Sequence, residues 1–152
     1  MPLEIVLVEP EIHTNTGNIG RLCLGTASKL HLVKPLGFEL SNSRLKRAGL
    51  DYWQHIDLEI HDSYEAFELK YQDRNKAFLS ARASKSIYNI PFKNEMMLVF
   101  GKESKGLPSH IVEKQASLLY KIPMIGDKIR SLNLANSVAI TLYEGLRCLN
   151  YK

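Results

Sequence analysis

Short apolar runs alternate with segments of helical periodicity along the chain. Ile5–Val8 is an uninterrupted run of apolar residues, typical of a strand buried on both faces of a parallel sheet. A loop over Glu9–Asn15 follows, and apolar residues from Thr16 to Ala27 then recur at helical spacing. Leu30–Val33 predicts a second strand, ended by Pro35. The first 35 residues therefore predict one β-α-β unit.

The rest of the chain continues this alternation. Further strands are predicted over residues 58–60, 77–79, 96–100 and 118–122, and helices over 41–52, 64–71, 109–116 and 134–149. The pattern predicts an α/β fold, with a mostly parallel sheet flanked by helices. Since the sequence shows no repeat, low-complexity tract or linker, we expect a single domain over residues 1–152.

The last predicted helix has an unusually broad apolar surface. One stripe contains Leu134, Val138, Leu142, Leu146 and Leu149, and Ala135, Ala139 and Tyr143 extend it sideways. A helix on the surface of a monomer normally keeps a polar half. Two interpretations remain open: burial within the subunit, or a face for self-association.

Composition narrows the class of protein. Hydrophobic residues make up 45% and charged residues 24%, which is typical of soluble globular proteins and excludes disordered and fibrous classes. The early apolar run stops at Glu9, far short of the roughly 18 residues that span a membrane, and no basic leader precedes it. We expect a cytoplasmic protein without a membrane partner.

Cys23 and Cys148 lack metal-ligand spacing, so two buried thiols are expected rather than a disulfide or zinc site.

The net charge of +4 favours an anionic partner without identifying one.

The first candidate loop, Asn15–Arg21, lies between the first strand and its helix. Ligands of open α/β sheets collect at the carboxyl ends of strands, and this loop offers amides, two glycines and a guanidinium there. The alternative is an ordinary helix start, capped by Asn15 or Thr16.

Two later loops also carry polar residues after predicted strands. Phe100–Pro108 has the glycine spacing of a phosphate loop, but Leu107 and Pro108 replace the Lys and Ser/Thr that such a loop needs. Its carboxylate, Glu103, is either functional or a solvated loop charge. Ile122–Ser137 ends a strand in proline and begins the last helix with Asn and Ser, which serve either as helix caps or as partners of a ligand.

Taken together, these loops resemble a known family. The segments N-T-G-N-I-G-R, V-F-G-K-E-S-K-G-L-P and I-P-M-x5-R-S-L-N-L-A-N-S resemble, in order and spacing, the three signature motifs of the SPOUT class of RNA ribose methyltransferases. P-E-I-H-T-N-T-G-N-I-G-R-L-C, L-H-L-V-K-P-L-G-F and K-R-A-G-L-D-Y-W resemble the short, single-domain members that methylate the wobble nucleotide of tRNA. The resemblance covers essentially the whole chain.

The resemblance implies a fold, a reaction and a pocket. It implies an α/β domain with a C-terminal deep trefoil knot that works as a homodimer. The broad apolar surface of the last helix, including Tyr143, is the expected dimer interface. The implied reaction transfers the methyl group of S-adenosylmethionine, without a metal, to the ribose 2′-hydroxyl of the wobble cytidine or modified uridine in the tRNA anticodon loop. The implied cofactor pocket comprises Leu79, Gly101, Ile122, Met124 and Ser131.

The same resemblance implies catalytic roles in the motif loops. Arg21 is the implied proton acceptor, although a guanidinium with a pKa above about 12 is a poor base and is better suited to holding a phosphate. Asn18, Glu103 and Asn133 match motif positions, and we expect them to orient loops or substrate.

RNA contacts are expected from basic residues around the pocket. The candidates are Arg44, Lys46, Arg47, Arg82 and Arg130. A solvated charged face explains the 44–47 cluster as well. Tyr52, Trp53 and Tyr88 fit either base stacking or core packing.

Two other functions remain compatible with the sequence. One is a non-enzymatic RNA-binding α/β module, which should not bind S-adenosylmethionine tightly. The other is 2′-O-methylation at a different tRNA or rRNA position.

Overall fold

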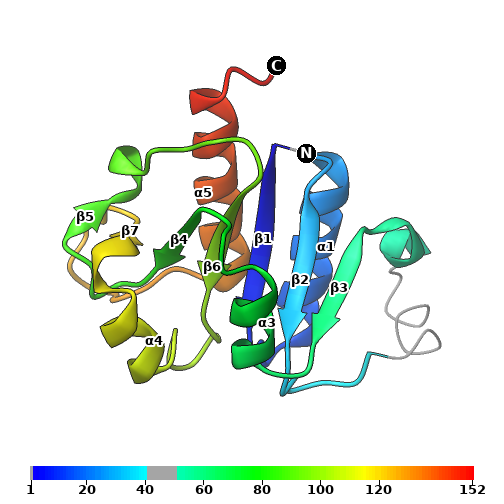
Figure 1. Ribbon diagram of the computed structural model, residues 1–152. Coiled ribbons are helices and arrows are strands. Elements are labelled where there is room, and N and C mark those ends of the chain that lie inside the picture. Colours follow the sequence, from blue (N-terminus) through cyan, green and yellow to red (C-terminus); the bar gives the residue numbers. More distant parts are fainter. Residues whose placement is uncertain (1, 41–50) are drawn as a thin grey trace.

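A seven-stranded parallel sheet forms the centre of the computed structural model, which describes residues 2–40 and 51–152 (Figure 1). The strand order is β3-β2-β1-β6-β4-β7-β5, and every pairing between these strands is parallel. The strands are β1 (Leu3–Val8), β2 (Lys29–Val33), β3 (Leu58–His61), β4 (Lys76–Leu79), β5 (Lys85–Ser86), β6 (Met96–Phe100) and β7 (Leu119–Lys121). The predicted α/β class and parallel sheet are confirmed.

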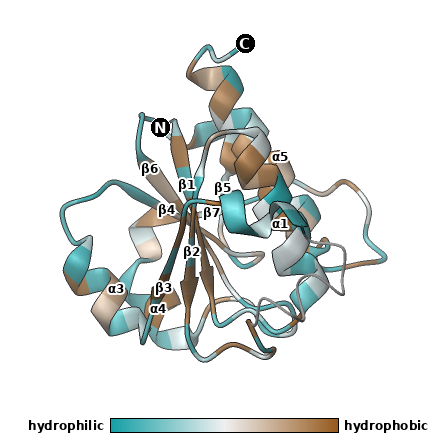
Figure 2. Cartoon of the chain, turned by 90° about the vertical axis from the view of Figure 1, so that its right-hand side faces the viewer, coloured by the Kyte–Doolittle hydropathy of each residue, from teal (hydrophilic) through white to brown (hydrophobic). Residues whose placement is uncertain are grey.

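Helices cover both faces of the sheet (Figure 2). One face carries α1 (His13–Gly25) and α5 (Leu134–Cys148), with the 3₁₀ turns η1 (Asp51–His55) and η2 (Ile87–Asn89). The other carries α3 (Tyr64–Lys70) and α4 (Ser109–Lys114), and η3 (Ala116–Leu118) leads into β7. Two separate hydrophobic clusters, one on each face, hold the three layers together.

The central strand β1 supplies both clusters. Leu3, Ile5 and Leu7 pack into the cluster beneath α1 and α5, whereas Val6 and Val8 pack into the cluster beneath α3. Successive side chains of a strand point to opposite faces, so a strand between two apolar layers needs an apolar residue at almost every position. This requirement explains the uninterrupted run that predicted β1.

The ends of several elements differ from the sequence-based predictions. α1 begins at His13, so Asn15 and Thr16 are buried residues inside the helix and not its caps. The N-cap residue is Ile12, which makes no side-chain capping bond. β5 and the 3₁₀ turns are too short to leave a periodic pattern. Of the helix predicted over 41–52, only residues 51–52 lie within the described residues, where they open η1.

The apolar stripe of α5 belongs to the core of the subunit. Leu134, Val138, Leu142 and Leu146 are all buried against the sheet. The adjoining side of the helix remains open to solvent, with Ile140 42% and Tyr143 57% exposed.

The two cysteines have different environments. Cys23 is buried in the cluster beneath α1, as predicted. Cys148 is exposed, so the prediction of two buried thiols was wrong; it lies in the last turn of α5, which extends beyond the sheet (Figure 1).

Among the described helices, none combines the length and the apolar character needed to cross a membrane.

Candidate active site

A cavity opens where β4, β6 and β7 end. In the sheet, β4 lies between β6 and β7, so the connection that leads from β6 to β7 passes over β4. The loops that leave the three strands therefore surround one space, in the position where open α/β sheets bind ligands. The cavity has a volume of about 1460 Å³. It is lined by all five residues expected in a cofactor pocket: Leu79, Gly101, Ile122, Met124 and Ser131.

The loop after β6 folds back tightly on its first residue. The backbone groups of Lys102 and Gly106 exchange two hydrogen bonds, with N···O distances of 3.3 and 2.9 Å, and Gly106 has a left-handed φ of 69°. A Cβ atom on Gly101 would lie only 2.0 Å from the carbonyl carbon of Gly106. Gly101 is thus required by the loop's own backbone, in addition to its place on the cavity wall.

Glu103 connects this loop to the start of α1. Its carboxylate accepts hydrogen bonds from the backbone N–H of Glu11, at 3.0 and 3.1 Å, and of Ile12, at 2.5 Å. Because Ile12 makes no side-chain capping bond, Glu103 supplies the acceptor for the N–H groups of the two residues just before α1. The interpretation of Glu103 as a merely solvated charge was wrong.

The connection is reciprocal. The Glu11 Oε1 atom accepts hydrogen bonds from the backbone N–H of Ser104, at 2.9 Å, and from the Ser104 hydroxyl, at 2.7 Å. These bonds hold the pKa of Glu11 below its usual range. We call Glu11, Ile12, Glu103 and Ser104 the glutamate clamp. Sequence reasoning missed Glu11 and Ser104, because bonds across more than 90 positions leave no local pattern.

Asn133 connects the N-terminal ends of α1 and α5, the two helices that lie on the same face of the sheet. Its Oδ1 atom accepts a hydrogen bond from the N–H of Asn136 at 3.2 Å and so caps α5. Its Nδ2 group donates to Oδ1 of the buried Asn15 in α1, at 3.1 Å. One amide side chain therefore fixes the third motif loop against the first.

Arg21 and Asn18 lie outside the cavity lining, on the exposed side of α1. The Arg21 guanidinium carbon is 5.7 Å from the centre of the Tyr52 ring, within cation–π range. The Tyr52 hydroxyl donates a 3.0 Å hydrogen bond to the carbonyl oxygen of Gly17. Tyr52 therefore ties η1 to α1 and provides a surface on which Arg21 rests.

Trp53 and Tyr88, the two other aromatic residues considered for base stacking, lie in different environments. Trp53 is buried against Gly20, where a Cβ would come within 2.7 Å of the indole ring. It belongs to the core. Tyr88 is 66% exposed and remains available for stacking.

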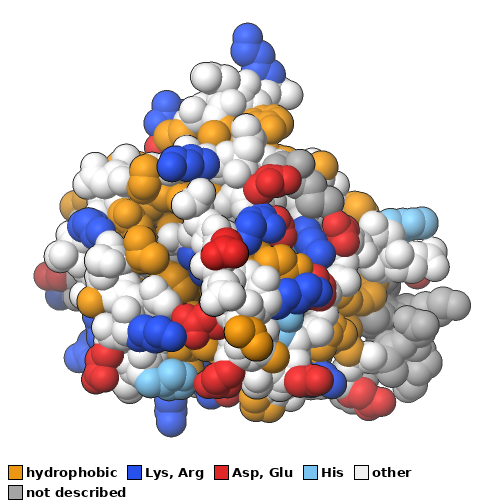
Figure 3. Space-filling view, in the orientation of Figure 1, with side chains coloured by type: hydrophobic (Ala, Val, Ile, Leu, Met, Phe, Trp, Pro, Cys, Tyr) orange, Lys and Arg blue, Asp and Glu red, His pale blue; other side chains and the backbone are white. Residues whose placement is uncertain are grey.

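Two of the expected RNA-binding residues, Arg82 and Arg130, lie in the cavity lining. The other three, Arg44, Lys46 and Arg47, lie outside the described residues. Acidic and basic side chains are interspersed over the face that carries α3 and α4 (Figure 3). Among the described residues, Arg82 and Arg130 reach the cavity from its loops, and α4 adds His110 and Glu113 to the lining.

Comparison with known proteins places this arrangement in a family of RNA-modifying enzymes. The model of the SpoU rRNA Methylase family matches residues 2–143. The chain therefore belongs to the SpoU methylase family. A relative from Methylovorus glucosotrophus, named tRNA (cytidine(34)-2′-O)-methyltransferase, is 43% identical over 145 residues, covering 95% of this chain and 94% of its own.

Solved structures agree with this assignment. One, described as giving insight into the 2-OH methylation of C/U34 on tRNA, has a TM-score of 0.89 and 45% identity, and the match covers 99% of this chain and 97% of that one. The SpoU methyltransferase AviRb from Streptomyces viridochromogenes, in complex with AdoMet, has a TM-score of 0.80 at 18% identity, covering 98% of this chain and 58% of its own. The latter likeness concerns the fold alone.

Proposed function

We propose that this protein is a tRNA (cytidine(34)-2′-O)-methyltransferase. It transfers a methyl group from S-adenosylmethionine to the ribose 2′-hydroxyl of the wobble cytidine or modified uridine in the anticodon loop. The observation that carries the proposal is the meeting of the loops after β4, β6 and β7 at one cavity, in a chain that matches relatives of this activity along nearly its whole length.

The residues of the cavity fit the proposed cofactor. Leu79, Ile122 and Met124 offer apolar surface for its adenine and methionine parts, and the close backbone at Gly101 offers main-chain hydrogen-bonding groups. The volume exceeds the roughly 300–1,000 Å³ of an ordinary small-molecule pocket, which leaves room for a nucleotide beside the cofactor. When bound, S-adenosylmethionine supplies an electrophilic methyl group on a sulfonium centre.

The chain's own contribution is chiefly positional. Aligning a hydroxyl oxygen with a methyl group can supply about 7–11 kcal/mol of the barrier. The glutamate clamp and the Asn133–Asn15 bond hold the three motif loops in fixed relation, which suits this task.

Arg21 serves in this proposal to hold a phosphate beside the target ribose. A guanidinium presents a planar fork of donors to phosphate, whereas it is a poor proton acceptor. The exposed position of Arg21 against Tyr52 supports contact with RNA. Arg82 and Arg130 at the cavity, together with the 44–47 cluster, supply salt-dependent affinity for the anticodon arm.

The active unit is proposed to be a homodimer in the cytoplasm. Ile140 and Tyr143 leave an apolar surface on α5, and α1, which carries Arg21, packs beside that helix. A second subunit on this surface would bring further RNA-binding groups toward the cavity. Replacing Tyr143 with Glu should shift the protein toward monomer in sedimentation experiments at low concentration, and an unchanged dimer would contradict this interface.

The C-terminal segment is proposed to form a deep trefoil knot. The chain leaves β7, lines the cavity with Ile122, Met124 and Ser131, and then enters α5 on the sheet face opposite α4. Such a path allows the segment after β7 to pass through the loop formed by the preceding strands.

The decisive experiment maps 2′-O-methylation in total tRNA from cells with and without the gene. Loss of the modification at position 34 alone supports the proposal, and loss at another position redirects it to a different RNA target. Purified protein should also methylate an anticodon stem-loop with a free 2′-hydroxyl at position 34, and not one already methylated there. RNA binding without affinity for S-adenosylmethionine would instead indicate a non-enzymatic binding module.

A further inference from the structure

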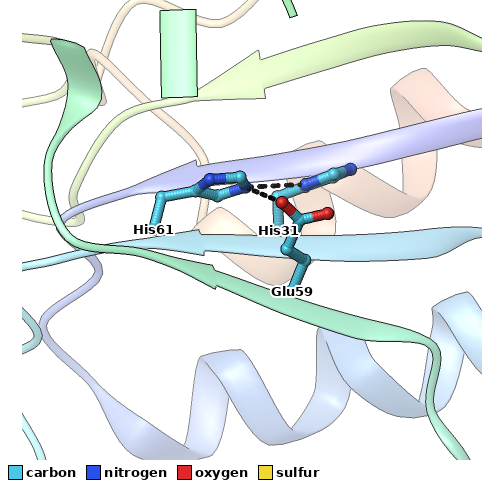
Figure 4. Close-up of side chains that lie close together, drawn as sticks. All are labelled: His31, Glu59 and His61. Atoms are coloured by element: carbon cyan, nitrogen blue, oxygen red, sulfur yellow. Dashed lines mark hydrogen bonds and ion pairs between the residues drawn. The ribbon is translucent and has the colours of Figure 1, made fainter. Parts of the chain in front are cut away.

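A compact group of metal-ligand side chains lies outside the cavity. His31 comes from β2, and Glu59 and His61 come from the neighbouring strand β3 (Figure 4). The strand register places Glu59 directly beside His31, and His61 follows two residues later, so all three point to the same face of the sheet. This is the face covered by α3, opposite α1 and α5.

The spacing of their ligand atoms suits one small cation. His31 Nδ1 lies 3.0 Å from His61 Nε2, and this nitrogen lies 3.5 Å from Glu59 Oε2. The three potential ligand atoms all lie within 4.8 Å of one another. Tetrahedral zinc, with bonds of about 2.0–2.2 Å to nitrogen and oxygen, places its ligand atoms roughly 3.3–3.5 Å apart. Two of the three ligand pairs therefore need to move by only a few tenths of an ångström, and the third, which lies within 4.8 Å, closes as the Glu59 carboxylate turns toward the metal.

The surroundings already orient the ligands. Glu4 Oε1 lies 2.7 Å from His31 Nε2, which fixes the proton on that nitrogen and turns the Nδ1 lone pair toward His61. A carboxylate behind a histidine is the usual outer partner of a metal-bound imidazole. The Tyr71 hydroxyl likewise donates to Glu59 Oε1, at 2.6 Å. These contacts are what a metal site needs in addition to its ligands.

We propose that His31, Glu59 and His61 form a binding site for a divalent transition metal of the zinc type. The site is separate from the proposed methyl transfer and does not depend on it. Without metal, a single proton between the two imidazoles satisfies both nitrogens. With metal, both nitrogens offer lone pairs, the His61 proton moves to its other ring nitrogen, and Glu59 supplies the third ligand.

The main competitor for the metal is a lysine. Lys70 Nζ lies 2.7 Å from Glu59 Oε2, the same oxygen that faces His61, and the Lys70 side chain is 59% exposed. Lys29 pairs with the other carboxylate oxygen, at 2.9 Å. Because Lys70 can swing into solvent at little cost, the metal displaces it from Oε2 while Lys29 stays in place. The nearby positive charges reduce the affinity of the site without removing a ligand.

A bound metal would link an edge strand to the sheet. Among the described residues, β3 is the last strand on its side of the sheet and pairs with β2 alone. A metal held by both strands adds a cross-link near the carboxyl end of this pair. The expected role is structural, since the ligands come from regular strands and two of them are buried.

The test uses the full-length protein without a histidine tag and free Zn²⁺ as the probe. Titration calorimetry should give one zinc per chain, and zinc should raise the melting temperature. Co²⁺ at the same site should give the visible absorption of a tetrahedral complex. His61→Ala and Glu59→Gln should each lose this binding, whereas His110→Ala, which alters an exposed histidine on α4, should retain it.

Lys70→Met provides a gain-of-binding variant. Removal of the competing ammonium should tighten zinc binding by about fivefold, the upper range for an exposed ion pair. Circular dichroism of each metal-free variant verifies that it folds, and Glu59→Gln keeps the shape of the side chain if His61→Ala does not fold. Absence of zinc binding by the wild type, binding that survives Glu59→Gln and His61→Ala, or an unchanged affinity in Lys70→Met would overturn the proposal.

Discussion

The Glu103 carboxylate accepts hydrogen bonds from the backbone N–H of Glu11, which lies 92 positions away in the sequence and two residues before the first residue of α1. In return, the Glu11 carboxylate binds the backbone and hydroxyl of Ser104, the next residue after Glu103. The two loops are therefore fixed by side-chain-to-backbone bonds in both directions. One of these loops lines the cavity and the other leads into the helix that carries Arg21.

Loss of the Glu103 carboxylate should destabilise the protein. Glu103→Ala leaves the N–H groups of Glu11 and Ile12, just before α1, without this acceptor, and loss of a comparable capping bond typically costs about 0.5–2 kcal/mol. Urea unfolding should show a decrease of about 1 kcal/mol in the free energy of unfolding. Glu65→Ala, at an exposed position on α3, is the matched control and should change it far less. Equal effects in both variants would show that the cap contributes nothing.

The contribution of Glu11 should depend on pH in a defined direction. Its hydrogen bonds to Ser104 lower its pKa below the ordinary value of 4.5, so the bonded carboxylate stabilises the folded state above that pH. The stabilisation should be lost as the pH falls through the lowered pKa of the folded protein. The wild type should thus exceed Glu11→Leu in melting temperature by a constant amount between about pH 6 and 8, and the difference should shrink in acid. A difference that grows below pH 4.5 would contradict this assignment.

Arg21 should act on the rate of methyl transfer through position. Arg21→Ala should slow single-turnover transfer at saturating tRNA by about a hundredfold, the scale expected for a misplaced substrate. Arg21→Lys should recover only part of the rate, because a point charge cannot replace the planar fork. Rates that rise with pH toward the titration of arginine would favour the role of base. Full activity of Arg21→Ala would remove this residue from the chemical step.

Gly101 and Met124 should respond differently to substitution although both line the cavity. Gly101→Ala puts a Cβ 2.0 Å from the backbone of Gly106, so the loop cannot keep its path. We expect loss of S-adenosylmethionine binding in calorimetry together with a lower melting temperature. Met124→Leu keeps the size and apolar character of its side chain and should reduce affinity by less than about tenfold. Normal affinity in Gly101→Ala would locate the cofactor elsewhere.

The two thiols should differ in reactivity. Burial raises the pKa of Cys23 to about 12, so this residue stays protonated and shielded at neutral pH. Cys148 is exposed and should react with a thiol reagent in the native protein. A colorimetric assay should detect about one thiol per native chain and two after denaturation, and Cys148→Ser should remove the native signal. Rapid modification of Cys23 would contradict its placement in the core.

The sequence predicted elements whose cause is local. β1 was recognisable because a strand between two apolar layers is apolar at almost every position, and the cap of α5 because Asn133 lies only three residues before Asn136, whose N–H group it binds. The start of α1 was misplaced because the N–H groups just before it bond to Glu103, outside any local window. The cavity residues were suggested only by the family motifs, whereas their convergence depends on the strand order β6-β4-β7.

The central position of β1 has a consequence for the order in which the molecule is assembled. β1 pairs with β2 on one side and with β6 on the other, and β6 is formed by Met96–Phe100. During synthesis from the N-terminus, one edge of the first strand therefore stays unpaired until two thirds of the chain has been made. Unpaired apolar edges promote association between chains. The nascent N-terminal half is consequently expected to need protection from aggregation until β6 leaves the ribosome.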